Sequence, residues 1–157
     1  MQALAEYHWL RGHENCIITG PTGVGKRYLA YAFGNQACRR GFTVRYFRAP
    51  RLFQELAVAR ATGRYERMLH GLLRTDLIIN DDWGTSLLTD KEPRDLFEIM
   101  EDRYDRASTL IAAQVPIEHW HETIGAPTLS DAILDRRVHN AHTITLKGES
   151  MRKRTTT

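Results

Sequence analysis

The stretch that decides the fold is residues 15–26, NCIITGPTGVGK, in which a short apolar run leads into a glycine-rich turn and a lysine. The last seven residues match the pattern GxxxxGK, and they lie between a predicted strand and a predicted helix, as this motif requires. Glycines let the backbone turn closely around a ligand, and the start of a helix attracts negative charge. We therefore predict a phosphate-binding loop in which Lys26 reaches the β- and γ-phosphates, and its members are Gly20, Pro21, Thr22, Gly23, Val24, Gly25, Lys26 and Arg27.

The residue after the lysine departs from the usual pattern. A Ser or Thr normally follows, and its hydroxyl is a Mg²⁺ ligand, whereas Arg27 has no acceptor and adds a positive charge. Two arrangements remain open: the guanidinium swings outward and leaves Mg²⁺ to water and acidic residues, or it contacts phosphate and displaces the metal. In both arrangements we expect hydrolysis to suffer more than binding, because the metal neutralises charge that develops in the transition state.

A second acidic motif follows at residues 77–82, LIINDD, where an apolar strand ends in two carboxylates. This pattern is typical of the Walker B motif that accompanies a phosphate loop. We expect Asp81 to bind Mg²⁺ and Asp82 to orient or deprotonate the attacking water, with strand alternation aiming the two side chains in different directions. Asn80 is unusual, because a buried parallel strand is normally apolar at such a position.

A polar side chain also follows the predicted strand at residues 108–113, STLIAA. Open α/β sheets bind their ligands outside the carboxyl ends of the strands. Gln114 is therefore a candidate to contact the γ-phosphate or the attacking water, although a glutamine at the edge of a loop is nearly as good an interpretation.

Turn signals divide the remaining chain into alternating helices and strands. Strands with helices between them at this spacing indicate βαβ crossovers and a parallel sheet that is covered on both faces. The predicted class is α/β with five strands at 15–19, 43–47, 76–80, 108–113 and 141–146. The predicted helices cover residues 2–11, 26–40, 50–61, 65–73, 89–106, 117–123 and 129–139.

Length and composition exclude several classes of protein. The 157 residues suit one domain, and a hydrophobic content of 42% excludes a disordered chain. Two cysteines are too few for a disulfide scaffold, and no apolar run is long enough to span a membrane. The first residues lack the apolar core of a signal peptide, so we expect a cytoplasmic protein. The net charge of +3 permits a nucleic-acid partner without requiring one.

Together these motifs resemble the AAA+ ATPase core, and specifically the IstB-like transposition helper ATPases of bacterial insertion sequences, which are related to the helicase loader DnaC. The resemblance covers nearly the whole chain, and it implies the AAA+ sheet order with the phosphate-loop strand in a central place. It is most specific in the segments ITGPTGVGK (18–26), GNQACRRGFTVRYFR (34–48), DDWG (81–84), LFEIMEDRYDR (96–106), PTLSDAILDRRVHNAH (127–142) and LKGESMRKR (146–154).

The resemblance also assigns roles to two further residues. Gln114 falls at the sensor-I position, and Arg136 falls where this clade carries its arginine finger, which acts in a neighbouring subunit and implies an oligomer assembled with ATP. A solvent-facing helical arginine is the alternative for Arg136, and Arg137 competes for the role.

The implied function is that of a DNA-stimulated ATPase, which hydrolyses ATP to ADP and phosphate and assists a transposase in DNA transposition. The implied cofactors are ATP and Mg²⁺, and the implied partners are double-stranded DNA, a transposase and further copies of the chain. The alternative is a hydrolysis-deficient nucleotide- or DNA-binding remnant that acts as an interaction module. We expect a leading helix over 1–12, an AAA+ domain over 13–148 and a basic tail over 149–157, without the N-terminal DNA-binding region of the family.

Residues 98–105, which include Arg103, have the alternating charges of a solvated helix face. The histidine pairs at 119/121 and 139/142 have no nearby cysteines at the spacing of a zinc site, so we do not expect one there. A DNA-binding face and an ordinary solvated surface are equally good interpretations of one set of arginines, namely Arg39, Arg40, Arg45, Arg48, Arg51, Arg60, Arg64 and Arg67.

Overall fold

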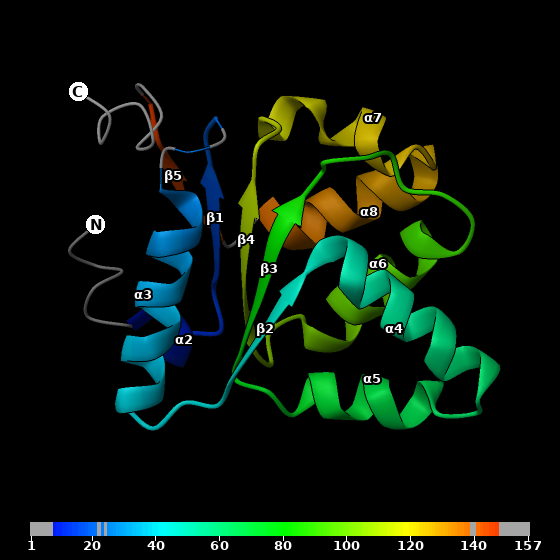
Figure 1. The fold of residues 1–157 in the computed structure, drawn as a ribbon, viewed down its shortest axis with the longest axis horizontal. Helices are drawn as coiled ribbons and strands as arrows, with labels where there is room; N and C mark the ends of the chain where they lie inside the picture. The colour runs from blue at the N-terminus through cyan, green and yellow to red at the C-terminus, as the bar shows by residue number, and fades with distance from the viewer. Residues whose placement is uncertain (1–7, 22, 24, 139–140, 148–157) are drawn as a thin grey trace.

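The computed structural model describes residues 8–21, 23, 25–138 and 141–147. Within them, five parallel strands form one sheet in the order β2-β3-β4-β1-β5 (Figure 1). The strands are β1 (Asn15–Thr19), β2 (Val44–Arg48), β3 (Leu77–Trp83), β4 (Ser108–Ala113) and β5 (Ala141–Thr145). This confirms the predicted α/β class. The phosphate-loop strand β1 has a neighbour on each side, although β4 is the middle strand.

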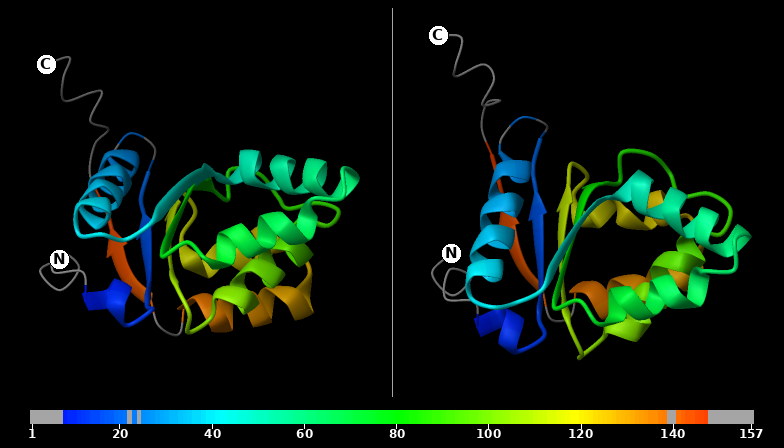
Figure 2. Two further views of the ribbon diagram at one scale, coloured as in Figure 1. Left: turned by 90° about the horizontal axis from the view of Figure 1, so that it is seen from below. Right: turned by 60° about the horizontal axis from the view of Figure 1, so that its bottom comes forward.

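Helices cover both faces of the sheet (Figure 2). One face packs against α2 (His8–Arg11) and α3 (Lys26–Arg39). The other face carries a larger apolar core, which holds side chains from the remaining α-helices. These helices are α4 (Ala49–Ala61), α5 (Tyr65–Leu73), α6 (Glu92–Arg103), α7 (Trp120–Ile124) and α8 (Pro127–Val138), and the 3₁₀ helix η1 (Ile117–His119) precedes α7.

Successive side chains of β1 point to opposite faces of the sheet, and both faces are buried under helices. Cys16 and Ile18 pack with α3, whereas Ile17 packs with the opposite core. Burial raises the pKa of the Cys16 thiol to about 12, so the thiol is neutral at physiological pH. Both Cys16 and Cys38 are free cysteines, which agrees with the expectation of a chain without a disulfide scaffold.

Strand β3 is longer than the sequence predicted, and its end is irregular. It continues through both aspartates to Trp83, and its pairing with β4 shifts register between Asn80 and Trp83, which is a β-bulge. Asp82 lies in the left-handed region with φ 54°. The expectation that simple alternation separates the two aspartates is therefore wrong, because the bulge turns Asp82 and both carboxylates contact one arginine, as described below.

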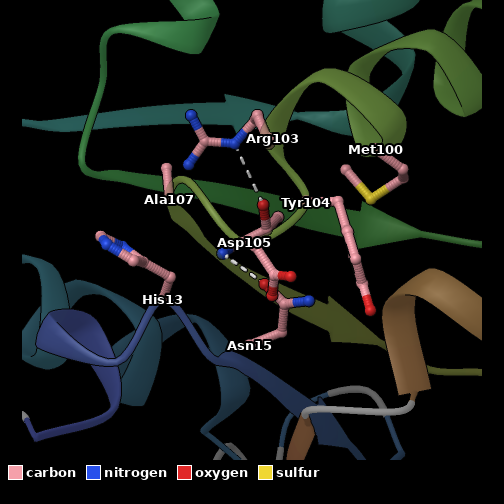
Figure 3. Close-up of a pocket in the computed structure, with 8 residues that line it drawn as sticks. His13, Asn15, Met100, Arg103, Tyr104, Asp105 and Ala107 are labelled. Atoms are coloured by element: carbon pink, nitrogen blue, oxygen red, sulfur yellow. Dashed lines mark hydrogen bonds between the residues drawn. The ribbon is translucent and has the colours of Figure 1, made fainter.

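The prediction of a solvated helix face over 98–105 holds for Glu101, Asp102 and Asp105, which are exposed, but it is wrong for Arg103. The Arg103 side chain is buried, and it donates to the carbonyl oxygens of Leu72 (2.5 Å), Thr75 (2.7 Å) and Ser108. Burial lowers the pKa of its guanidinium to about 10. Figure 3 shows Arg103 in a pocket whose lining also includes Asn15, the first residue of β1. This arginine satisfies the carbonyls of three segments at once, which periodicity along α6 does not reveal.

Candidate nucleotide-phosphate site

The phosphate loop connects the carboxyl end of β1 with the first residue of α3. The N–H group of Gly20 donates to the carbonyl oxygen of Ala113 (3.2 Å), so the loop begins tied to the end of β4. Gly25 precedes α3 with φ 97°, a left-handed conformation that glycine adopts without strain. Thr22 and Val24, which belong to the predicted loop, lie outside the described residues.

Lys26 is the first residue of α3, and its side chain folds back across the loop. Its ammonium donates to the carbonyl oxygens of Gly20 (2.6 Å) and Pro21 (2.8 Å). Desolvation lowers the pKa of Lys26, and the nearby carboxylates of Asp81 and Asp82 oppose that shift. The structure therefore brings the lysine, the loop and both aspartates together at one edge of the sheet, as the sequence predicted.

Arg27 does not swing outward, which was the first of the two arrangements left open by the sequence. Its guanidinium lies against the acidic motif, with Nε 2.9 Å from Asp81 Oδ2 and Nη2 3.1 Å from Asp82 Oδ2. The hydrogen bond to Asp81 is the main reason that the pKa of Arg27 is raised. One guanidinium thus bridges the two carboxylates that were predicted to serve the metal and the attacking water.

Asp81 is enclosed by further donors. Its side chain is 4% exposed, and its Oδ2 also accepts a hydrogen bond from the hydroxyl of Tyr46. Its Oδ1 accepts the backbone N–H of Asp82 (2.8 Å). Burial is the largest cause of the raised pKa of Tyr46, and the hydrogen bond to Asp81 adds to it, so the hydroxyl keeps its proton.

Asp82 has a second cation, which the sequence did not place in the site. Arg48 donates through Nε to Asp82 Oδ2 at 2.7 Å, and its Nη2 lies 2.5 Å from the same oxygen. Arg48 is the last residue of β2, and it pairs in register with Asp81 on β3. The sequence held a signal for this contact, because Arg48 directly follows the predicted strand at 43–47. The carboxyl ends of neighbouring parallel strands meet at one edge of the sheet.

The residues at this position do not fit the predicted Mg²⁺ ion. Arg27 supplies no oxygen ligand, and Oδ2 of each aspartate already accepts from a cationic side chain. The structure therefore offers a site for phosphate without a formed site for the divalent cation.

Of two other predicted site residues, the structure places Gln114 but does not describe the side chain of Arg136. Gln114 directly follows β4 and lines a cavity together with Thr19, Gly20 and Pro21, so it lies beside the start of the loop. Arg136 belongs to α8, but its side chain, like that of Arg137, is outside the described part of the chain. The arginine-finger role stays a prediction.

The arginines of the predicted basic face are spread over both faces of the sheet. Arg39 lies at the end of α3, whereas Arg60 lies on α4, and these two helices cover opposite faces of the sheet. Carboxylates already engage three of the eight arginines: Arg48 pairs with Asp82, Arg51 with Glu55 and Arg60 with Asp95. The basic segment at 151–154 lies outside the described residues.

Comparison with known proteins decides the family. Residues 1–157, the whole chain, match the family described as IstB-like ATP binding protein. This chain belongs to the IstB-like ATP-binding family. An insertion-sequence ATP-binding protein of Sinorhizobium fredii is 54% identical to this IstB-like chain over 145 residues, which are 92% of the chain and 59% of the relative. The chain spans 49% to 59% of the length of the first curated relatives that it matches.

Solved structures with a similar fold are AAA+ proteins of DNA replication. The DnaC helicase loader aligns with a TM-score of 0.78 at 18% identity, over 93% of this IstB-like chain and 85% of the loader chain. AMPPCP-bound DnaA from Aquifex aeolicus aligns with a TM-score of 0.76 at 22% identity, over 96% of this chain and 47% of DnaA. At these identities the comparison shows the AAA+ fold.

Among the described helices, none has both the length and the apolar character that a membrane crossing requires.

Proposed function

We propose that this IstB-like domain binds and hydrolyses ATP, assembles with it on double-stranded DNA, and supports DNA transposition through contact with a transposase. The observation that carries the proposal is the loop after β1, where Lys26 and the start of α3 face Asp81 and Asp82. The family name and the insertion-sequence relatives support ATP and transposition as the context.

The chain's own groups account for nucleotide binding. The ammonium of Lys26 now bonds to two loop carbonyls, and it can exchange them for phosphate oxygens with little movement. The N–H groups at the start of α3 add a favourable field for negative charge. Gln114 and Asp82 are the groups proposed to hold the attacking water, and Arg136 of a second copy is proposed to complete the site.

A second candidate function is ATP binding without hydrolysis, and the contacts of Arg27 favour it. Asp82 Oδ2 already accepts hydrogen bonds from the guanidiniums of Arg27 and Arg48, so this oxygen is not free to accept one from an attacking water. In that case ATP binding alone drives assembly, and the domain acts as an interaction module on DNA.

The experiment is sizing of the chain with a double-stranded DNA fragment, with and without ATP. We expect a larger DNA-bound species with ATP, and we expect Lys26→Ala to abolish it. Lys91→Ala is the matched control, because Lys91 is an exposed lysine just before α6. A species whose size is independent of ATP and of Lys26 would contradict the proposal. Phosphate release in the same samples separates the two candidates, since Arg27→Thr should hydrolyse faster than the native chain if Arg27 is what blocks turnover.

A further inference from the structure

One positively charged side chain occupies the place that the acidic motif normally keeps for a metal. The Arg27 guanidinium contacts Asp81 Oδ2 at 2.9 Å and Asp82 Oδ2 at 3.1 Å, so it bridges the two carboxylates as a divalent cation would. It is also the residue that directly follows the phosphate-loop lysine. The same side chain therefore removes a metal ligand and supplies a positive charge in its stead.

The carboxylates need no metal to be neutralised. Asp81 and Asp82 face the guanidiniums of Arg27 and Arg48, and the ammonium of Lys26 lies near both carboxylates. A Mg²⁺ ion at Asp81 would have to displace Arg27 from a carboxylate that is 4% exposed, or add two positive charges to a cluster that already holds more cations than anions. Tyr46 donates to the same Asp81 oxygen and further fills the coordination space.

Arg27 keeps donors that a nucleotide can use. A guanidinium has five N–H donors, and within the described residues Arg27 commits one from Nε and one from Nη2. Its side chain is 51% exposed and lies in the first turn of α3, next to Lys26. The remaining donors form the planar fork that suits phosphate oxygens.

We propose that Arg27 is the resident cation of this site, so that the chain binds a nucleoside triphosphate without a divalent metal. This deepens the proposed function, on which it rests for the identity of the ligand. The Arg27 guanidinium stays on Asp81 and Asp82 and turns its free donors to the phosphates, while Lys26 and the loop hold the other oxygens.

The test measures ATP affinity by calorimetry in Mg²⁺ and in EDTA. For the native chain we expect dissociation constants that agree within about threefold, because the site carries its own cation. For Arg27→Thr we expect at least about tenfold tighter binding in Mg²⁺ than in EDTA, since the freed carboxylates and the new hydroxyl can take the metal. Arg27→Gln, which keeps the length of the side chain, should likewise gain dependence on Mg²⁺, and it replaces Arg27→Thr if that variant does not fold.

Arg39→Thr is the matched control, because it makes the same chemical change at the other end of α3 and should behave like the native chain. A native chain that binds ATP at least tenfold tighter in Mg²⁺, as Arg27→Thr is expected to do, would overturn the inference.

A second measurement needs no nucleotide, so it separates the inference from the proposed function. Urea unfolding of the native chain, Arg27→Gln, Asp81→Asn and the double variant gives the coupling between the two side chains. We expect the effects to be non-additive by at least about fivefold in the unfolding equilibrium constant. Additive effects would overturn the resident cation. Non-additive effects without ATP binding in either buffer would support the resident cation and overturn the proposed function.

Discussion

Arg27 and Arg48 determine the character of the phosphate site, because they neutralise the two carboxylates that chemistry at this position needs. Arg27 comes from the helix that follows the loop, and Arg48 comes from the end of the neighbouring strand β2. A strained backbone at Asp82, with φ 54°, holds the second carboxylate within reach of both. Lys26 and the described part of the loop are therefore left for the proposed nucleotide, while the acidic half of the site is occupied by the protein's own cations.

The buried side chain of Arg103 should contribute to the stability of the folded chain. Arg103→Met removes a buried donor from the carbonyl oxygens of Leu72, Thr75 and Ser108. Leu72 keeps the N–H group of Thr75 as a donor, and each buried carbonyl that is left unpaired costs about 1–3 kcal/mol. We expect the free energy of unfolding in urea to fall by about 3 kcal/mol or more. Arg106→Met is the control, because Arg106 is exposed, and it should change stability by less than about 0.5 kcal/mol. Equal effects of the two substitutions would show that Arg103 is solvated, as its sequence context first indicated.

At the scale of elements, the sequence predicts most boundaries, because apolar runs bounded by glycine, proline and aspartate mark where strands and helices end. The predicted bounds of β1, β4 and α5 agree with the structure, and β2 is displaced by one residue. The end of β3 was not predictable in this way. Its bulge depends on how the strand pairs with β4, and a property of two strands together is not encoded in the pattern of either one.

The contact between α3 and β3 gives a prediction at this scale. A Cβ atom added to Gly34 would lie 2.8 Å from Cδ1 of Ile79, so this glycine sets how closely the helix approaches the sheet. Gly34→Val overfills the contact, and we expect a loss of about 1–3 kcal/mol in the free energy of unfolding. Asn35→Val places the same side chain at an exposed position of the same helix and should have little effect. Unchanged stability in Gly34→Val would contradict the packing of α3 on Ile79.

For the whole molecule, the parallel sheet gathers the carboxyl ends of its strands at one edge, and the phosphate loop, Asp81, Asp82 and Gln114 lie at that edge. The sequence predicted this assembly from the fold class and the motifs. It did not predict that Arg48 joins the site or that the arginine-rich segments divide between two faces, because both follow from which strands and helices become neighbours. The similarity to DnaC and DnaA shows the fold, whereas the charges of the site are known from this chain alone.

The most direct test of nucleotide binding through the loop is a calorimetric titration of ATP into the native chain and into Lys26→Ala. Lys26 is the charged side chain that spans the loop, and a charge-assisted hydrogen bond to phosphate contributes about 1.5–3 kcal/mol. We expect the native chain to bind ATP and Lys26→Ala to bind it at least about tenfold more weakly. Equal affinities in the two proteins would contradict the account.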